Sequence, residues 1–192
     1  MAPRIPPVSL DGADDRAREQ LERVSEFRGD DVTVLNIFGT LGHHPDLMRR
    51  WLVFGNHVLS KSTLSGRDRE LAILRAGWRC RAPYEWGQHV VIARREGITD
   101  EEIAQIAEGP DAAGWSPHEA AILRTVDELH DTSTVSDATW STLVETFSPQ
   151  QCMDLVFAIG QYHLVSYALN AFRVERDDGV DTSAVPFPEP AG

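Results

Sequence analysis

Signals for helix starts recur along the 192-residue chain, and they constrain its fold more than any other feature. Thr99–Glu102, Ser116–Glu119 and Ser148–Gln151 each place a hydroxyl residue three positions before Glu or Gln, which is the pattern of a capping box. In the last two, a proline occupies the first helical position, where a backbone N–H is not needed. The one β-like run, Val32–Leu35, is too isolated to pair. The sequence therefore predicts an all-α protein.

The spacing of apolar residues agrees with these signals. Leu71, Leu74 and Trp78 stand at i, i+3 and i+7, and Leu155 and Ile159 begin a similar stripe late in the chain. Both patterns are typical of helices that bury one face. The predicted helices cover residues 14–27, 46–60, 66–80, 83–96, 99–108, 116–131, 136–146 and 148–173.

The two ends of the chain differ from its helical middle. Three prolines in the first seven residues oppose a helix there. Residues 176–192 combine acidic residues with glycine and proline and show no apolar period. We therefore expect an N-terminal arm over residues 1–15, a single helical domain over residues 16–175, and an acidic, proline-containing C-terminal tail.

Composition narrows the function classes. The net charge of −12, without a block of Lys or Arg, argues against binding to a phosphate backbone, so we expect no nucleic-acid partner. No stretch reaches the ~20 apolar residues of a membrane span, and the first residues lack the apolar region of a signal peptide. The two cysteines, Cys80 and Cys152, do not make a disulfide-stapled secreted fold. We therefore expect a cytoplasmic protein that does not contact membranes.

The segment from Arg69 to His89 is the richest in chemistry. It reads as two helices joined by a tight turn at Arg81–Pro83, so the second helix folds back on the first. Glu85 and His89 are four residues apart and share a helix face. Glu70 lies about three turns before the corner, and the hairpin can bring it near that face. Two carboxylates and an imidazole between packed helices would perturb one another's proton affinity, as acid/base catalysis requires.

Simpler interpretations of the same residues stay open. Glu85 and His89 can form a surface ion pair, and Glu70 near a helix start can complement the helix dipole. Cys80, close to the corner, can be a small buried hydrophobe. The two glutamates and His89 are also residue types that ligate metals, but three ligands without a convincing second shell make a weak case. We therefore expect no metal and no cofactor.

The stretch RELAILRAGWRCRAPYEWGQHVVIARREGITDEEIAQIAEGP resembles the carboxymuconolactone decarboxylase family, which includes the alkylhydroperoxidase D-like proteins. The resemblance is most specific over about residues 40–110 and continues more loosely through WSPHEAAILRTVDELH and LVFAIGQYHLVSYALNAF. It implies an all-helical protein built on a helical hairpin, assembled as a homotrimer or hexamer. It also implies an enzyme that acts on a small molecule.

The resemblance implies two branches of chemistry. The peroxidase branch uses a Glu, a Cys-x-x-Cys and a His; Glu70 and His89 match this pattern, but Ala82 and Glu85 replace the two cysteines. A dithiol peroxidase is therefore disfavoured. The decarboxylase-like branch performs cofactor-free chemistry on small oxo acids or lactones. In that branch His89 is the proton donor or acceptor, Glu70 orients it, and Glu85 is a second acid.

Other residues are weaker candidates. Cys80, Tyr84, Trp86 and His163 are candidates for lining a substrate site, with plain packing as the simpler interpretation. Candidates for anchoring a substrate carboxylate are Arg69, Arg75, Arg79 and Arg81. The sequence thus favours an acid/base enzyme of the lyase type. A peroxide-detoxifying reductase and a non-catalytic, ligand-binding helical oligomer are the alternatives.

Overall fold

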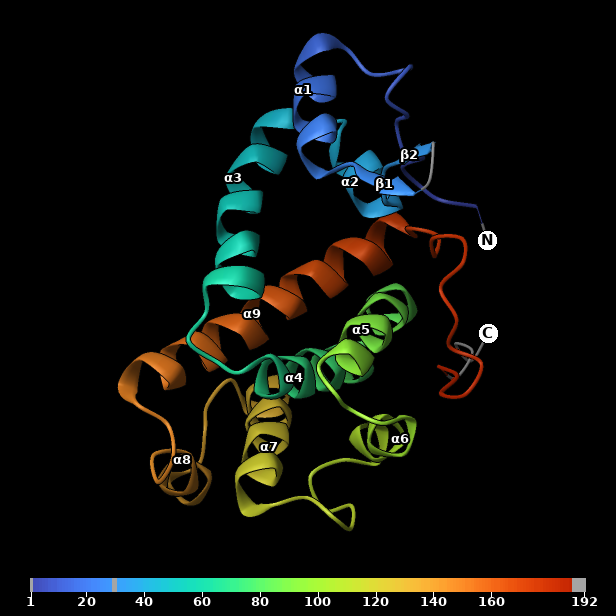
Figure 1. Cartoon of the computed structure of the whole chain (residues 1–192). Helices are drawn as coiled ribbons and strands as arrows, with labels where there is room; N and C mark the ends of the chain where they lie inside the picture. The colour runs from blue at the N-terminus through green and yellow to red at the C-terminus, as the bar shows by residue number, and fades with distance from the viewer. Residues whose placement is uncertain (1, 29–30, 188–192) are drawn as a thin grey trace.

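A computed structural model describes residues 2–28 and 31–187 of the chain (Figure 1). Within this part, nine α-helices, one short π-helix and a two-stranded hairpin make up the regular structure. In chain order the elements are α1 (Asp15–Val24), β1 (Glu26–Arg28), β2 (Asp31–Thr33), α2 (Asn36–Leu41), α3 (Pro45–Asn56), η1 (His57–Lys61), α4 (Gly66–Arg79), α5 (Pro83–Arg95), α6 (Asp100–Glu108), α7 (Pro117–Thr132), α8 (Asp137–Leu143) and α9 (Pro149–Phe172).

The all-α prediction is confirmed, and the predicted start signals operate as expected. The side chains of Thr99, Ser116 and Ser148 each cap a helix. In return, the backbone N–H of each capping residue donates to the side chain of the Glu or Gln three residues later. The long helices therefore begin within a residue or two of their predicted starts. In the described part of the chain, none of these helices combines the length and the apolar character needed to cross a membrane.

Four local features differ from the predictions. The first predicted helix stops at Val24, and β1 pairs antiparallel with β2, so the run beginning near Val32 does have a partner. Helix α2 was missed because its N-cap is Leu35, which has no side-chain oxygen to signal a start. The last turn of the predicted 46–60 helix widens into the π-helix η1.

Helix α4 lies at the centre of the molecule, between α5, α7 and α9 (Figure 1). Its residues 70–77 are all buried, which includes the charged Glu70 and Arg75. A charged residue is rarely buried this deeply without a partner, so both side chains mark positions where the core holds an ion pair.

The predicted corner between α4 and α5 is confirmed. Arg81 adopts a left-handed backbone conformation with φ of 51°, and the N–H of Ala82 donates to the carbonyl of Gly77 at 2.9 Å. This six-residue closure ends α4, and Pro83 then starts α5 at its first position. The two helices consequently run back along each other.

The described parts of both ends pack on the helical body. Near the start, the N–H of Val8 donates to the carbonyl of Gly39. Near the end, the indole N–H of Trp86 donates to the carbonyl of Val185 at 3.0 Å, and Phe187 packs edge-on against Trp78. The described part of the C-terminal tail therefore contributes apolar groups to the core, although it forms no helix there.

Candidate active site

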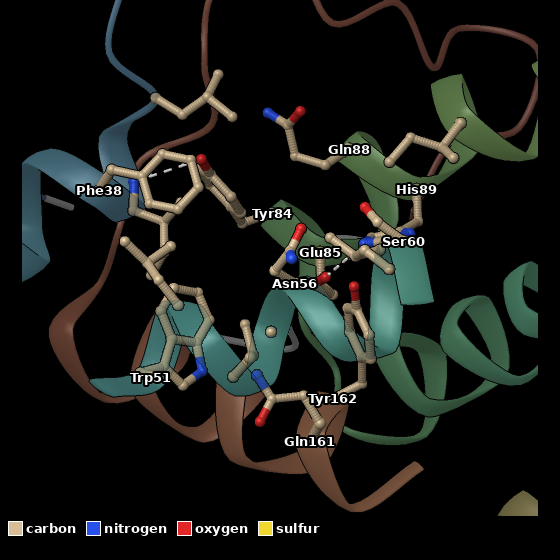
Figure 2. A pocket seen from close by; sticks show the side chains of 17 residues that line it. Phe38, Trp51, Asn56, Ser60, Tyr84, Glu85, Gln88, His89, Gln161 and Tyr162 are labelled. Carbon is tan, nitrogen blue, oxygen red and sulfur yellow. Dashed lines mark hydrogen bonds and ion pairs between the residues drawn. The ribbon is translucent and has the colours of Figure 1, made fainter. Parts of the chain in front are cut away.

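A cavity of about 270 Å³ lies among α2, α3, η1, α5 and α9 (Figure 2). Its wall is mostly apolar, and its polar groups come chiefly from α5 and α9. The lining residues are Leu35, Ile37, Phe38, Trp51, Leu52, Gly55, Asn56, Leu59, Ser60, Tyr84, Glu85, Gln88, His89, Ile92, Gln161, Tyr162 and Val165. A largely apolar cavity with a few convergent polar groups is the usual form of a small-molecule site.

The three predicted acid/base residues converge at this cavity. His89 lies between the two carboxylates: its Nδ1 is 2.6 Å from Glu70 Oε2, and its Nε2 is 2.9 Å from Glu85 Oε1. All three side chains are buried, so the surface-ion-pair interpretation is wrong. Glu85 and His89 line the cavity, whereas Glu70 stands behind the ring on α4. The predicted convergence is confirmed, and a catalytic role for these residues stays a prediction.

The electrostatics of this group favour a charged imidazole. Burial by itself lowers the pKa of His89, but the carboxylates of Glu70 and Glu85 outweigh that effect and raise the pKa to about 10. His89 is therefore an imidazolium at neutral pH. With one carboxylate on each nitrogen, the cation also separates two negative charges that would repel each other if adjacent.

Arg69 extends the group by one more charge. Its Nε donates to Glu70 Oε1 at 2.9 Å, so Glu70 is held by a guanidinium on one oxygen and by the imidazole on the other. Two cations and two anions alternate along this chain, from Arg69 through Glu70 and His89 to Glu85. Tyr162 of α9 packs edge-on against the His89 ring at 4.8 Å and closes its other side. The ring orientation is thus fixed from three directions.

A second polar cluster at the cavity was not foreseen. The Tyr84 hydroxyl donates to Asp177 Oδ2, and Gln88 Nε2 donates to the same oxygen at 2.7 Å. Burial, followed by the Asp177 carboxylate, raises the pKa of Tyr84 above its ordinary value. Asp177 lies in the C-terminal tail, and no motif connects it with α5. Only the folded chain brings it to the rim of the site.

Three of the four weaker substrate-site candidates lie elsewhere. Tyr84 lines the cavity, but Trp86, Cys80 and His163 do not. Trp86 follows Glu85 directly, and one residue along a helix turns the side chain by about 100°, into the core beside Trp78. The same rotation turns His163 away from the cavity that its neighbour Tyr162 faces.

The two cysteines do not reproduce a peroxidatic pair. Cys80 stands at the C-cap of α4, and Cys152 is buried in the first turn of α9; both are free thiols. Burial raises the pKa of Cys80 to about 11, against smaller opposing effects of Ser166 and Arg79, and burial also raises the pKa of Cys152. Both groups are therefore thiols and not thiolates at neutral pH, which makes them weak nucleophiles.

Three of the four candidate arginine anchors are already engaged. Arg75 holds Asp127 through two hydrogen bonds of 2.8 Å, and Arg79 pairs with Asp127 and Asp131. Arg69 is held by Glu70, and Arg81 is exposed at the corner. No arginine is among the described residues that line the cavity. The arginine candidates are therefore not borne out at this cavity: α4 directs Arg75 and Arg79 toward α6 and α7, and Arg69 is held by Glu70 and Glu96.

The Glu70–His89–Glu85 group is poorly arranged for one metal ion. The two carboxylates contact opposite nitrogens of the ring, so they cannot both join the same imidazole nitrogen around one ion. Glu85 and His89 Nε2 are left as two ligands that could meet a metal from the cavity side. The donor set therefore fits proton transfer better than metal binding.

Comparison with known proteins agrees with the helical fold and with the family resemblance of the sequence. The helical hairpin and the surrounding helices form the all-α fold that solved alkylhydroperoxidase D-like structures share. Residues 45–128 match the carboxymuconolactone decarboxylase family, and the chain carries a domain of that family. Comparison with curated protein sequences gives no significant match.

Several solved structures are similar over nearly the whole chain. An uncharacterised peroxidase-related protein from Ralstonia eutropha JMP134, described as an alkylhydroperoxidase core, has 22% identity and a TM-score of 0.79, covering 92% of this chain and 93% of its own. A peroxidase-related protein from Silicibacter sp. TM1040 has 14% identity and a TM-score of 0.79, covering 98% and 99%. A variant of the debrominase Bmp8, bound to 2,3,4-tribromopyrrole, has 13% identity and a TM-score of 0.73, covering 96% and 95%. Identities this low establish the shared fold alone.

Proposed function

We propose that this protein is a cofactor-free enzyme that moves a proton on a small molecule bound in the cavity. The observation that supports this most is the buried His89 held between Glu70 and Glu85, with His89 and Glu85 facing the cavity. Such a cluster is costly to bury, and strongly perturbed groups in a cavity are typical of functional sites.

The geometry suggests separate roles for the three residues. Glu85 is the proton acceptor, because it is a carboxylate that reaches the cavity. His89, an imidazolium at neutral pH, stabilises the negative charge that develops on the substrate when its proton leaves. Glu70 is a positioning residue: it holds His89 Nδ1 and so directs Nε2 toward Glu85 and the cavity. The proton taken by Glu85 returns to another carbon, or replaces a lost carboxyl group.

The cavity wall supports a mainly apolar substrate of one small ring. Its volume of about 270 Å³ is slightly below the range of drug-sized sites, which starts at roughly 300 Å³. Among the described lining residues, only His89 can carry a positive charge. A substrate carboxylate would have to pair with His89 itself, so isomerisation of a lactone or oxo compound fits better than decarboxylation. The amide of Gln161, whose oxygen has no hydrogen-bond partner in the described chain, can hydrogen-bond such a ligand.

Two alternatives remain as outcomes of the test. Peroxide reduction is suggested by the names of the Ralstonia and Silicibacter proteins, but it needs reactive thiols that this site lacks. Binding without turnover is suggested by the apolar wall. The debrominase's ligand, tribromopyrrole, is a small ring of the kind that such a cavity would accept.

We also propose that the protein forms a homo-oligomer, a trimer or a multiple of one. Along α9, Met153, Phe157, Leu164 and Tyr167 are each more than half exposed, and they form one continuous stripe. Phe54 of α3 packs edge-on against Phe157 and widens the stripe. An apolar surface of this kind on one face is typical of an interface between subunits.

The test of the catalytic proposal is proton exchange in D₂O. A panel of small neutral lactones, cyclic ketones and oxo compounds is incubated with the protein, and deuterium uptake is measured by mass spectrometry. We expect wild-type protein to accelerate exchange at the carbon next to the carbonyl group of at least one class. The Glu85→Gln variant should lower that rate by ~10²–10⁴-fold. Glu101→Gln changes an exposed glutamate and is the matched control.

The roles of the other two residues have separate signatures. His89→Gln should reduce the exchange rate by ~10²–10³-fold, as expected for loss of a charge-stabilising donor, whereas His57→Gln should not. Glu70→Gln should shift the alkaline limb of the pH–rate profile to lower pH, because it removes a carboxylate that raises the pKa of His89.

Tight binding of a ligand without proton exchange would favour the alternative of a non-catalytic binding protein. Equal exchange in wild type and Glu85→Gln would contradict the proposal.

A further inference from the structure

A cluster of side chains of metal-binding types lies where three helices meet, apart from the cavity. It consists of Cys80 at the C-cap of α4, His130 in the last turn of α7 and His163 in the middle of α9. One ligand atom from each residue lies within 4.8 Å of the others, and each side chain is partly buried. The proposed acid/base chemistry uses none of these three residues.

The hydrogen bonds in this cluster fix which nitrogen faces inward. His163 Nδ1 lies 2.8 Å from the carbonyl of Ile159, which only accepts, so Nδ1 carries the hydrogen. The lone pair of the neutral ring is then on Nε2, and this atom lies 3.0 Å from Nδ1 of His130. A backbone carbonyl that orients an imidazole in this way is the usual second shell of a metal-bound histidine.

The distances are close to those of a tetrahedral zinc site. With Zn–N near 2.0 Å and Zn–S near 2.3 Å, two nitrogens bound to one ion are about 3.3 Å apart, and a nitrogen and a sulfur about 3.6 Å. The two imidazole nitrogens therefore need to separate by a few tenths of an ångström. The thiol needs to approach by about 1.2 Å at most, which a side-chain rotation provides.

A buried hydroxyl beside the thiol is a second, independent observation that points to a metal-bound thiolate. Ser166 is fully buried on α9, one turn from His163 on the side of Cys80, and its hydroxyl has no well-formed hydrogen bond in the described chain. Leaving such a group unsatisfied is costly. A metal-bound thiolate at Cys80 is a strong acceptor and would take this hydrogen.

We propose that Cys80, His130 and His163 bind one transition-metal ion with nitrogen and sulfur preference, Zn²⁺ being the reference case. On binding, Cys80 releases its proton to solvent and coordinates as thiolate. His130 moves its hydrogen from Nδ1 to Nε2, and the imidazole–imidazole hydrogen bond is replaced by two metal–nitrogen bonds. Three protein ligands leave the fourth position to water. The ion joins the ends of α4 and α7 to α9 and stabilises their packing.

Metal titration of the full-length chain tests this site. We expect one Zn²⁺ per chain, a rise in Tm on binding, and a thiolate-to-metal charge-transfer band with Co²⁺. Cys80→Ser should abolish the band, and His163→Gln should weaken binding by at least tenfold. Cys152→Ala removes the other thiol and His89→Gln removes the cavity imidazole, and both should leave the band unchanged. A band that survives Cys80→Ser, or is lost in His89→Gln, would overturn the assignment.

A measurement on the wild-type protein tests the same site without depending on whether the variants fold. Alkylation of Cys80 by iodoacetamide is followed by mass spectrometry with and without Zn²⁺, with Cys152 as the internal reference. Coordination should slow modification of Cys80 at least tenfold and leave Cys152 unaffected. Equal rates of Cys80 modification with and without Zn²⁺ would contradict the proposal.

Discussion

The raised pKa of His89 predicts how the free energy of unfolding changes with pH. The carboxylates of Glu70 and Glu85 raise its pKa from the ordinary value of 6.5 to about 10 in the folded chain. A histidine in the unfolded chain keeps the ordinary value. Between these two pH values the native protein binds one proton more than the unfolded protein. The free energy of unfolding should therefore fall as the pH rises through this window.

The size of the effect follows from proton linkage. One extra proton in the native state gives a slope of about 1.4 kcal/mol per pH unit. The stabilising contribution is complete below pH 6.5 and is lost by about pH 10. Over the whole window it amounts to about 5 kcal/mol at most, a large part of the stability of a typical domain.

Urea unfolding at a series of pH values measures this contribution. The wild-type curve should lose stability between pH 6.5 and 10 more steeply than the curve of His89→Gln, and the difference between the two isolates this residue. His57→Gln, at an exposed position, should follow the wild type. NMR of the wild-type imidazole is the direct check, because His89 should still be protonated at pH 8. Parallel curves for wild type and His89→Gln, together with a neutral His89 at that pH, would refute the reasoning.

Three further outcomes follow from the packing and the surface. Arg75→Ala should destabilise the fold by about 3–5 kcal/mol in urea unfolding, because it removes the two-pronged partner of Asp127 and leaves the carbonyls of Ile106 and Ala107 without this donor. Phe157→Glu should reduce the assembly to smaller species in light scattering, and a wild-type protein that is monomeric at micromolar concentration would contradict the proposed oligomer. Peroxide reduction with a dithiol donor should be absent or very weak in a coupled assay, because Cys80 and Cys152 are unpaired thiols whose pKa is raised by burial, and robust turnover would refute this.

The acid/base group was predictable because its members are close in sequence or one helix apart. Glu85 and His89 share a face by the four-residue spacing alone. The position of Glu70 near that face followed from the corner at Arg81–Pro83 alone, because a proline at a helix start indicates such a corner locally. The partner of the Tyr84 hydroxyl was not predictable, because Asp177 arrives from a segment 93 residues away that carries no periodic signal.

The sequence by itself determined the helical class, the positions of most helix starts and the identity of the three residues of the acid/base group. Local rules govern these features: side chains cap their own helices, and a four-residue spacing always shares a face. Only the tertiary structure decided that His89 lies between the carboxylates rather than beside them, and that Cys80, His130 and His163 meet. Such meetings depend on the angles and rotations with which helices pack, which no short stretch of sequence specifies.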